Sequence, residues 1–188
     1  MDNELKRVLN EIIDKKIIVP KKNRAYNSIR TIELIYGVNL PSDYKDFLNE
    51  CGACLIKDDR MYQPIEVTPV TPKDGFDSVG VFYGIADGTY DVISAIKIYM
   101  DILGSNVMPI ADADGGDLIC MGLKGKYKGK IYFWYHEEEV SNEDGTEYLY
   151  LIANSFKEFL LTFTHHKREK NVNLDDIELF LDDDLLNE

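Results

Sequence analysis

The sequence has few cysteines, fewer basic than acidic side chains and no long apolar run, and each shortage narrows what the protein can be. Three cysteines in 188 residues do not make a disulfide framework, which is typical of a reducing compartment. No apolar run approaches the roughly 20 residues that a membrane-spanning helix needs. The first residues, Met1 to Glu4, lack the basic and apolar regions of a secretory signal. We therefore expect a cytoplasmic protein without a membrane segment.

Acidic residues outnumber basic ones by 34 to 21, which gives a formal net charge of -13. Such a surface repels nucleic-acid phosphates and anionic lipid headgroups, and it attracts basic partners. Direct binding to nucleic acid or to a membrane is therefore disfavoured. The hydrophobic content of 45% is enough to form the core of one domain.

Much of the negative charge lies at the carboxyl end, between residues 171 and 188. The acidic residues there are Asp175, Asp176, Glu178, Asp182, Asp183, Asp184 and Glu188, and no basic residue lies among them. Leu174, Ile177, Leu181 and Leu185 recur at spacings of three and four, which predicts an apolar helical face. The segment is a helix docked on its own domain, a frayed end, an acidic arm for a basic partner, or half of a clasp with the basic residues between 15 and 24.

Apolar periodicity and turn residues predict an α+β fold, in which helices flank a mostly antiparallel curved sheet. Helices are predicted over residues 2–16, 25–36, 42–51, 89–103 and 155–163. Short strands broken by prolines are predicted over 55–70 and 80–86, two clearer strands over 118–123 and 130–135, and a further strand over 147–152. The strands over 118–123 and 130–135 are predicted to form a hairpin. A turn leads from 130–135 to the strand over 147–152.

Serine and glycine mark the ends of several predicted helices. Ser155, followed by Glu158, is expected to cap the last helix. Gly37 and Gly104 are expected to stop the helices that precede them, and Gly52 suits a left-handed cap after the third helix.

The motifs that suggest catalysis or metal binding do not hold up. Cys51 and Cys54 have the spacing of a thiol redox pair, but Cys51 follows a helix end, where the dipole disfavours a thiolate, so we interpret the cysteines as structural. The run from Asp112 to Asp117 lacks the later ligands of a calcium loop and reads as a glycine turn. His136 has no second histidine at zinc-protease spacing. We predict no enzyme activity, no catalytic residues, no metal and no cofactor.

Three segments together resemble a known family. They are Leu40-Pro41-Ser42-Asp43-Tyr44-Lys45-Asp46-Phe47-Leu48 closed by Gly52, Gly115-Gly116-Asp117-Leu118-Ile119-Cys120 followed by Ile131-Tyr132-Phe133-Trp134-Tyr135-His136-Glu137, and Ser155-Phe156-Lys157-Glu158-Phe159-Leu160. Their order and spacing resemble the SMI1/KNR4 (SUKH) domain between Ile29 and Phe163. The one departure is Cys51-Gly52-Ala53, where the family often has a glycine pair. The resemblance divides the chain into an amino-terminal helix with a basic linker (1–24), the SUKH-like domain (25–166) and the acidic tail (167–188).

What the resemblance implies is binding rather than catalysis. The family includes immunity proteins of bacterial polymorphic toxin systems and fungal regulatory scaffold proteins. The first hypothesis is therefore an immunity protein that neutralises a toxin with a basic surface, such as a nuclease, by direct binding. A regulatory scaffold or a small-ligand or peptide-binding module is the alternative.

Candidate partner-binding residues lie at the glycine turn, at the following strand end and among the tyrosines. They are Asp112, Asp114, Asp117, Glu137, Glu138, Glu139, Tyr62, Tyr83 and Tyr135. Carboxylates attract a basic partner, and tyrosine often anchors an interface. Each has a simpler interpretation as a surface carboxylate or a core aromatic. Trp134 is assigned to the core.

Overall fold

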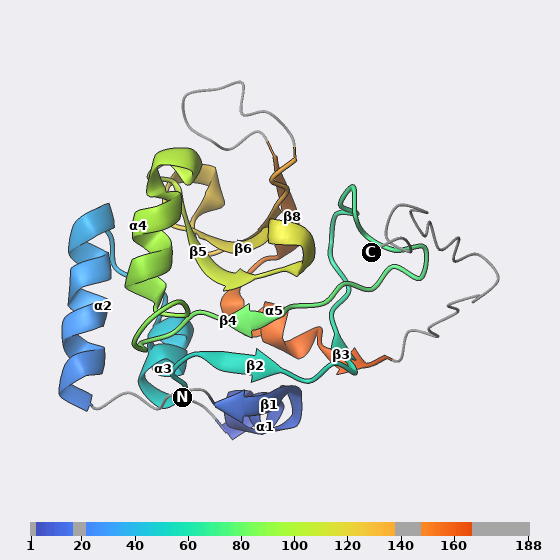
Figure 1. Ribbon diagram of the computed structural model, residues 1–188, viewed down its shortest axis with the longest axis horizontal. Helices are drawn as coiled ribbons and strands as arrows, with labels where there is room; N and C mark the ends of the chain where they lie inside the picture. Colours follow the sequence, from blue (N-terminus) through green and yellow to red (C-terminus); the bar gives the residue numbers. More distant parts are fainter. Residues whose placement is uncertain (1–2, 17–21, 138–147, 167–188) are drawn as a thin grey trace, which may run out of the picture.

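The computed structural model describes residues 3–16, 22–137 and 148–166 (Figure 1). The helices are α1 (Asn3–Ile12), α2 (Lys22–Tyr36), α3 (Ser42–Glu50), α4 (Val92–Leu103) and α5 (Phe156–Leu161), with short 3-10 turns η1 (Asp114–Gly116) and η2 (Gly125–Tyr127). The strands are β1 (Ile13–Lys16), β2 (Cys54–Ile56), β3 (Arg60–Met61), β4 (Val81–Phe82), β5 (Val107–Asp112), β6 (Leu118–Gly122), β7 (Ile131–Trp134), β8 (Leu149–Ala153) and β9 (Thr164–His165).

A seven-stranded sheet runs through the molecule in the order β1-β2-β4-β5-β6-β7-β8, and a two-stranded sheet pairs β3 with β9. Every neighbouring pair in these sheets is antiparallel. The predicted α+β class and the hairpin formed by β6 and β7 are therefore confirmed.

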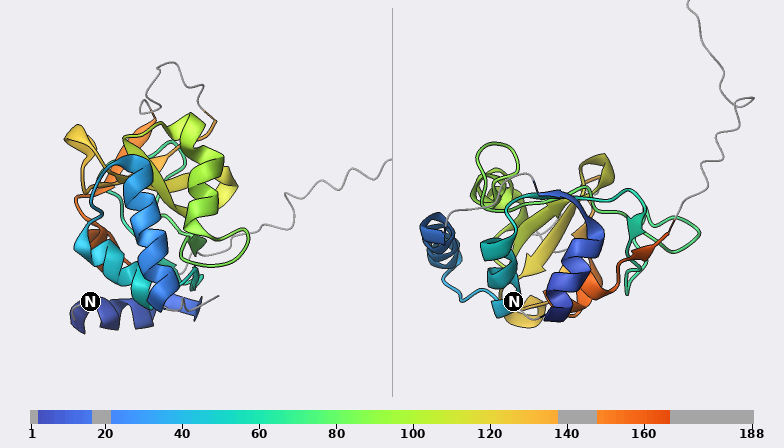
Figure 2. Two further views of the ribbon diagram at one scale, coloured as in Figure 1. Left: turned by 90° about the vertical axis from the view of Figure 1, so that its left-hand side faces the viewer. Right: turned by 90° about the horizontal axis from the view of Figure 1, so that it is seen from below.

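The central strands are buried on both faces. Every residue of β6 and β7 is buried, and so is every residue of β5 except Asp112. Because successive side chains of a strand point to opposite faces, both sides of the central sheet are covered. Helix α4 packs against β5, while α1 and α3 both contact α5. In the right-hand view of Figure 2, α4 lies across the central strands from α1 and α5.

An aromatic cluster joins two of the family segments in the core. Tyr44 and Phe47 of α3 meet Phe156 of α5 edge to face, with ring centroids 5.0 and 5.2 Å apart. Phe82 of β4 contacts Phe47 at 5.5 Å. Burying each such side chain contributes roughly 1.5–3 kcal/mol. The carboxylate of Asp43 also accepts the backbone N–H of Lys157 at 3.0 Å, so the amino ends of α3 and α5 are tied together.

Most of the predicted helix boundaries are confirmed. The Ser155 hydroxyl accepts the backbone N–H of Glu158 at 3.0 Å, and Gly37 and Gly104 adopt positive φ after α2 and α4. Helix α4 begins at Val92 rather than at residue 89, because Asp91 is its cap and accepts the N–H of Ser94.

The left-handed cap predicted at Gly52 is wrong. Helix α3 ends at Glu50, and Cys51 continues in extended backbone with φ -117° toward β2. The position at this corner that requires glycine is Gly84. A Cβ placed on Gly84 would lie 2.3 Å from the backbone carbon of Gly52, so only a residue without a side chain fits there.

The prediction of one helix over residues 2–16 is also wrong. Helix α1 ends at Ile12, and β1 follows at once as the edge strand paired with β2, with Ile13 opposite Ile56. The apolar spacing of Leu9 and Ile12 continues to Ile13 and suits a helix. The pairing that selects a strand comes from residues about 40 positions further along the chain.

Strand β5 was not predicted, because its third residue is Pro109, which cannot donate to a ladder. The sheet accommodates the proline in two ways. Strand β4 pairs with β5 only at Ala111, and the register between β5 and β6 shifts between Pro109 and Ala111.

Of the short strands predicted over residues 55–70, only β2 and β3 form, and of those over 80–86 only β4 forms. Between β3 and β4 the chain forms a long loop fixed by local contacts such as that of Tyr62 with Asp77. None of the helices in the described ranges is both long and apolar enough to span a bilayer.

Candidate functional site

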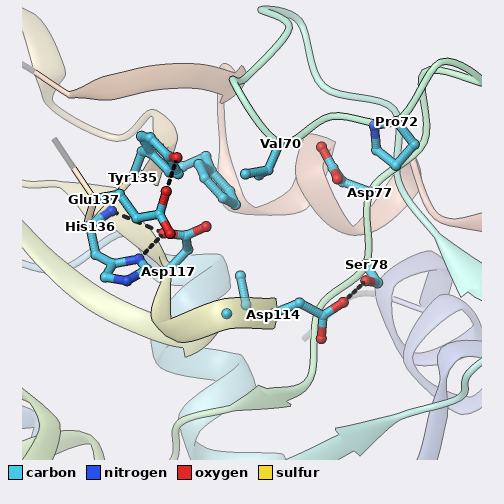
Figure 3. A pocket seen from close by; sticks show the side chains of 12 residues that line it. Val70, Pro72, Asp77, Ser78, Asp114, Asp117, Tyr135, His136 and Glu137 are labelled. Carbon is cyan, nitrogen blue, oxygen red and sulfur yellow. Dashed lines mark hydrogen bonds and ion pairs between the residues drawn. The ribbon is translucent and has the colours of Figure 1, made fainter. Parts of the chain in front are cut away.

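A cavity of about 260 Å³ opens where η1, the end of β7 and the long loop between β3 and β4 meet (Figure 3). We call it the acidic cavity, because Asp77, Asp114, Asp117 and Glu137 all line it. Its other walls include the apolar Val70, Pro72, Ala113 and Phe133. Among the described residues that line it, His136 is the only side chain able to carry positive charge.

The local fold brings these carboxylates together. Gly115 and Gly116 adopt φ of 77° and 100° in η1, a conformation that side chains disfavour, and they reverse the chain between β5 and β6. Leu118 of β6 pairs with Trp134 of β7. The residues just before β6 therefore lie beside those just after β7, which places Asp117 next to His136.

Asp117 is the most deeply placed of the four, with 2% of its surface exposed. Its Oδ1 atom accepts the backbone N–H of His136 at 2.9 Å and lies 2.7 Å from the ring Nδ1 of the same residue. An ionised carboxylate only accepts hydrogen bonds, so the ring contact requires a proton on Nδ1. Both contacts use one oxygen, and Figure 3 shows the other oxygen of Asp117 directed toward the open part of the cavity.

The other three carboxylates are also held in place. Asp114 is exposed and accepts the hydroxyl hydrogen of Ser78 at 2.8 Å. The buried Asp77 accepts the hydroxyl hydrogen of Thr71 at 2.7 Å, and Glu137 accepts the phenolic hydrogen of Tyr135. These contacts restrict the rotamers of the carboxylates before any partner binds.

Three carboxylates of the site affect the pKa of a buried tyrosine, Tyr62. Tyr62 has none of its surface exposed, and its hydroxyl has no hydrogen-bond partner among the described residues. Burial raises the pKa of Tyr62 well above its ordinary value, and the charges of Asp77, Asp117 and Asp114 raise it further. The three carboxylates therefore act together on one region of low dielectric.

A second cavity, of about 580 Å³, adjoins the acidic cavity at Ser78 and Asp114. Both of these residues line both cavities. The second cavity has apolar walls at Leu55, Met61 and Val79. Its charged residues are mixed in sign, and they are Lys57, Asp58, Asp59, Arg60 and Asp114.

The structure brings four of the predicted contact residues together, namely Asp114, Asp117, Tyr135 and Glu137. Asp112 lies at the end of β5, outside the lining of either cavity, and its carboxylate accepts the backbone N–H of Val81. Burial raises the pKa of Asp112. Its contact joins β5 to β4 and is structural. Glu138 and Glu139 lie outside the described residues.

Tyr62 and Tyr83 follow the simpler interpretation as core aromatics and are not available to a partner. Both are buried, with Tyr62 packed at 5.0 Å against the ring of Phe159. Burial also raises the pKa of Tyr83. Trp134 is buried, as expected.

The sequence-based interpretation missed Asp77, Ser78 and His136 as parts of one site. Asp77 and Ser78 belong to a loop without periodicity, so no local pattern marks them. His136 was considered only as a metal ligand. A signal for it was the apolar strand that ends at Trp134, because a polar side chain just after a buried strand lies at the edge of the sheet.

The cysteines do not contribute to the site. Cys51, Cys54 and Cys120 are buried free thiols, and burial raises the pKa of Cys120, which agrees with a structural role. No three His, Cys, Asp or Glu side chains are placed to hold a metal ion in the part of the chain that the structure describes.

Comparison with known proteins supports the resemblance noted in the sequence. The model of the SMI1 / KNR4 family (SUKH-1) matches residues 27–162, a range that includes every residue lining the acidic cavity. The chain is also 37% identical to the SPbeta prophage-derived uncharacterized protein YokK of Bacillus subtilis (strain 168), over 84% of this chain and 84% of that protein.

Proposed function

The chain belongs to the SMI1/KNR4 family (SUKH-1), and from this premise we propose that it is a non-enzymatic immunity protein that neutralises a bacterial toxin by direct binding. The observation that carries the proposal is the acidic cavity, where four fixed carboxylates converge with no lysine or arginine among the described lining residues. Such a surface favours a partner with complementary positive charge. The prophage origin of the relative fits a bacterial setting.

A nuclease is the class of toxin that best suits this charge. Nucleases need basic clefts to bind phosphate, and a protein of net charge -13 is drawn to such a cleft over a distance of about one Debye length. Binding there would exclude the nucleic acid. The acidic protein would therefore act by occupation and needs no catalytic group of its own.

The experiment is co-expression with any candidate toxin domain that a neighbouring gene encodes. The wild-type protein is expected to restore growth and to co-purify with the toxin. The Asp114→Asn/Asp117→Asn double variant is expected to do neither, while Asp101→Asn, at an exposed position of α4, behaves as wild type. Failure of the wild-type protein to protect against or bind any neighbouring toxin would refute the proposal.

The second cavity supports one other candidate, a small-ligand or peptide-binding module. Its volume of about 580 Å³ is in the range of ligand sites, and its apolar walls suit an organic ligand. Protection by thermal shift from a metabolite library, abolished by Leu55→Asp but not by Asp117→Asn, would favour this candidate over the first.

A further inference from the structure

The strongest unexplained feature of the acidic cavity is the free oxygen of Asp117. Only 2% of the surface of Asp117 is exposed. Both hydrogen bonds of its side chain are accepted by Oδ1. Its Oδ2 atom accepts no hydrogen bond from any described residue, and in Figure 3 it points into the cavity. This oxygen is accessible from the open cavity, so a donor group that enters the cavity can bind it, and a charged donor forms the stronger hydrogen bond.

The residues that line the cavity limit which chemical groups that donor can be. Part of the lining is apolar, with Val70, Pro72 and Phe133, and part carries carboxylates, among them Asp114 and Glu137. A small cation would leave the apolar part of the lining unused, and an anion would be repelled. The cavity therefore suits an aliphatic stem that ends in a positive charge.

Arginine fits these walls better than lysine. A guanidinium group is planar and carries five donors in a fixed fork, so it can meet carboxylates on different sides at once and pair with one of them through two bonds. It also stacks on aromatic faces, and Phe133 and Tyr135 both line the cavity. A lysine ammonium is a compact, strongly hydrated charge that gains less from such walls.

We infer that the acidic cavity is the receptor for an arginine side chain of the protein partner, with Asp117 as the anchoring carboxylate. The inference deepens the proposed function by naming the group on the partner that enters the site. His136 is a positioning residue, since it fixes one oxygen of Asp117 and leaves the other directed at the guanidinium. Asp114 also lines the cavity, and its carboxylate accepts a hydrogen bond from Ser78.

The test uses the full chain and an amino-acid probe, so it needs no toxin. Nα-acetyl-arginine methylamide is titrated into 15N-labelled protein and followed by amide chemical shifts. The matched control is the citrulline analogue, which has nearly the same shape without the charge. We expect saturable shifts at residues 114–117 and 133–137 with a Kd on the order of 1–10 mM, and no saturable shift with citrulline.

Variants distinguish the specific role of Asp117 in arginine binding from a general effect of negative charge. Asp117→Asn should weaken arginine binding about tenfold or more, and Asp114→Asn less, while Asp101→Asn leaves it unchanged. Because loss of Asp117 affects folding as well, the exposed Asp114→Asn variant serves as the second measurement, and unchanged shifts in the core verify the fold of both.

Three results would overturn the inference. They are an absence of saturable shifts, equal binding of the citrulline analogue, and equal binding of the lysine analogue, which would remove the assignment to arginine. Arginine binding without toxin protection would refute only the immunity function. Toxin protection without arginine binding would refute only the receptor.

Discussion

The two cavities share a wall but differ in how their charges are balanced. In the second cavity, Lys57 donates to the backbone carbonyl of Glu11 at 2.7 Å, and Arg60 and His165 both lie near Asp59. Its charges are therefore largely compensated within the chain. In the acidic cavity, Asp117 has one oxygen directed into the open space. In the larger cavity the charges are therefore mostly paired within the chain, whereas the smaller cavity offers an unused acceptor to a ligand.

The largest effect is expected on partner binding. The Asp114→Asn/Asp117→Asn variant should lose about 3 kcal/mol of affinity for a basic toxin domain, roughly 100-fold in Kd, because fixed carboxylates are removed from a desolvated contact. Isothermal titration calorimetry measures this loss. Asp58→Asn, an exposed position of the second cavity, is the matched control, and an equal loss there would erase the distinction between the cavities.

The next effect is on folding. Asp117→Ala should lower the free energy of unfolding by about 2 kcal/mol, because the buried carboxylate and both of its hydrogen bonds to His136 are lost. Asp114→Ala, on the exposed side of the same cavity, should cost less than about 0.5 kcal/mol. Urea denaturation compares the two. Equal costs would mean that burial does not distinguish the two carboxylates.

A smaller effect is expected from the turn itself. Gly115→Ala has open space for a Cβ, but its φ of 77° is strained for alanine by about 1 kcal/mol. The variant should lose that much stability and bind the arginine probe more weakly, because η1 carries Asp114. Gly75→Ala, which has a similar φ of 79° in the loop between β3 and β4, should lose similar stability and keep its arginine binding.

The smallest effect concerns Asp112, the carboxylate of this turn that lines neither cavity. Burial raises its pKa in the folded state, so the folded protein binds the proton more tightly than the unfolded chain does. Stability is then lost as the pH rises from the ordinary aspartate value of about 4 through the raised value. Asp112→Asn should lack this loss, as measured by unfolding at several pH values, and should bind arginine normally.

Local signals were sufficient for much of the fold and for half of the site. The serine cap at Ser155, the glycine stops at Gly37 and Gly104 and the hairpin of β6 and β7 depend on neighbouring residues, and all are confirmed. The acidic turn at Asp114 and Asp117 was visible as a cluster of carboxylates. What that pattern lacked was any means to tell the buried Asp117 from the exposed Asp114.

Two of the differences between prediction and structure originate in distant contacts. Ile13 becomes part of a strand because β2 offers it a partner, and Pro109 is tolerated in a central strand because the register shifts beside it. Tyr62 was a candidate contact residue, yet the rings of Phe159 and Phe163 pack against it in the core. The partners of Ile13 and Tyr62 lie far away along the chain, whereas Pro109 is accommodated by the adjoining strand β6.

By itself the sequence determined the family, the α+β class and the acidic character of the protein, because caps, turns, apolar periods and net charge are local or additive properties. Only the tertiary structure decided which carboxylates meet. Asp77 comes from a loop, Asp114 and Asp117 from a glycine turn and Glu137 from a strand end. The pairing of β6 with β7 places Asp117 beside His136, and the pairing of Asp77 with Tyr62 fixes the loop that carries Asp77.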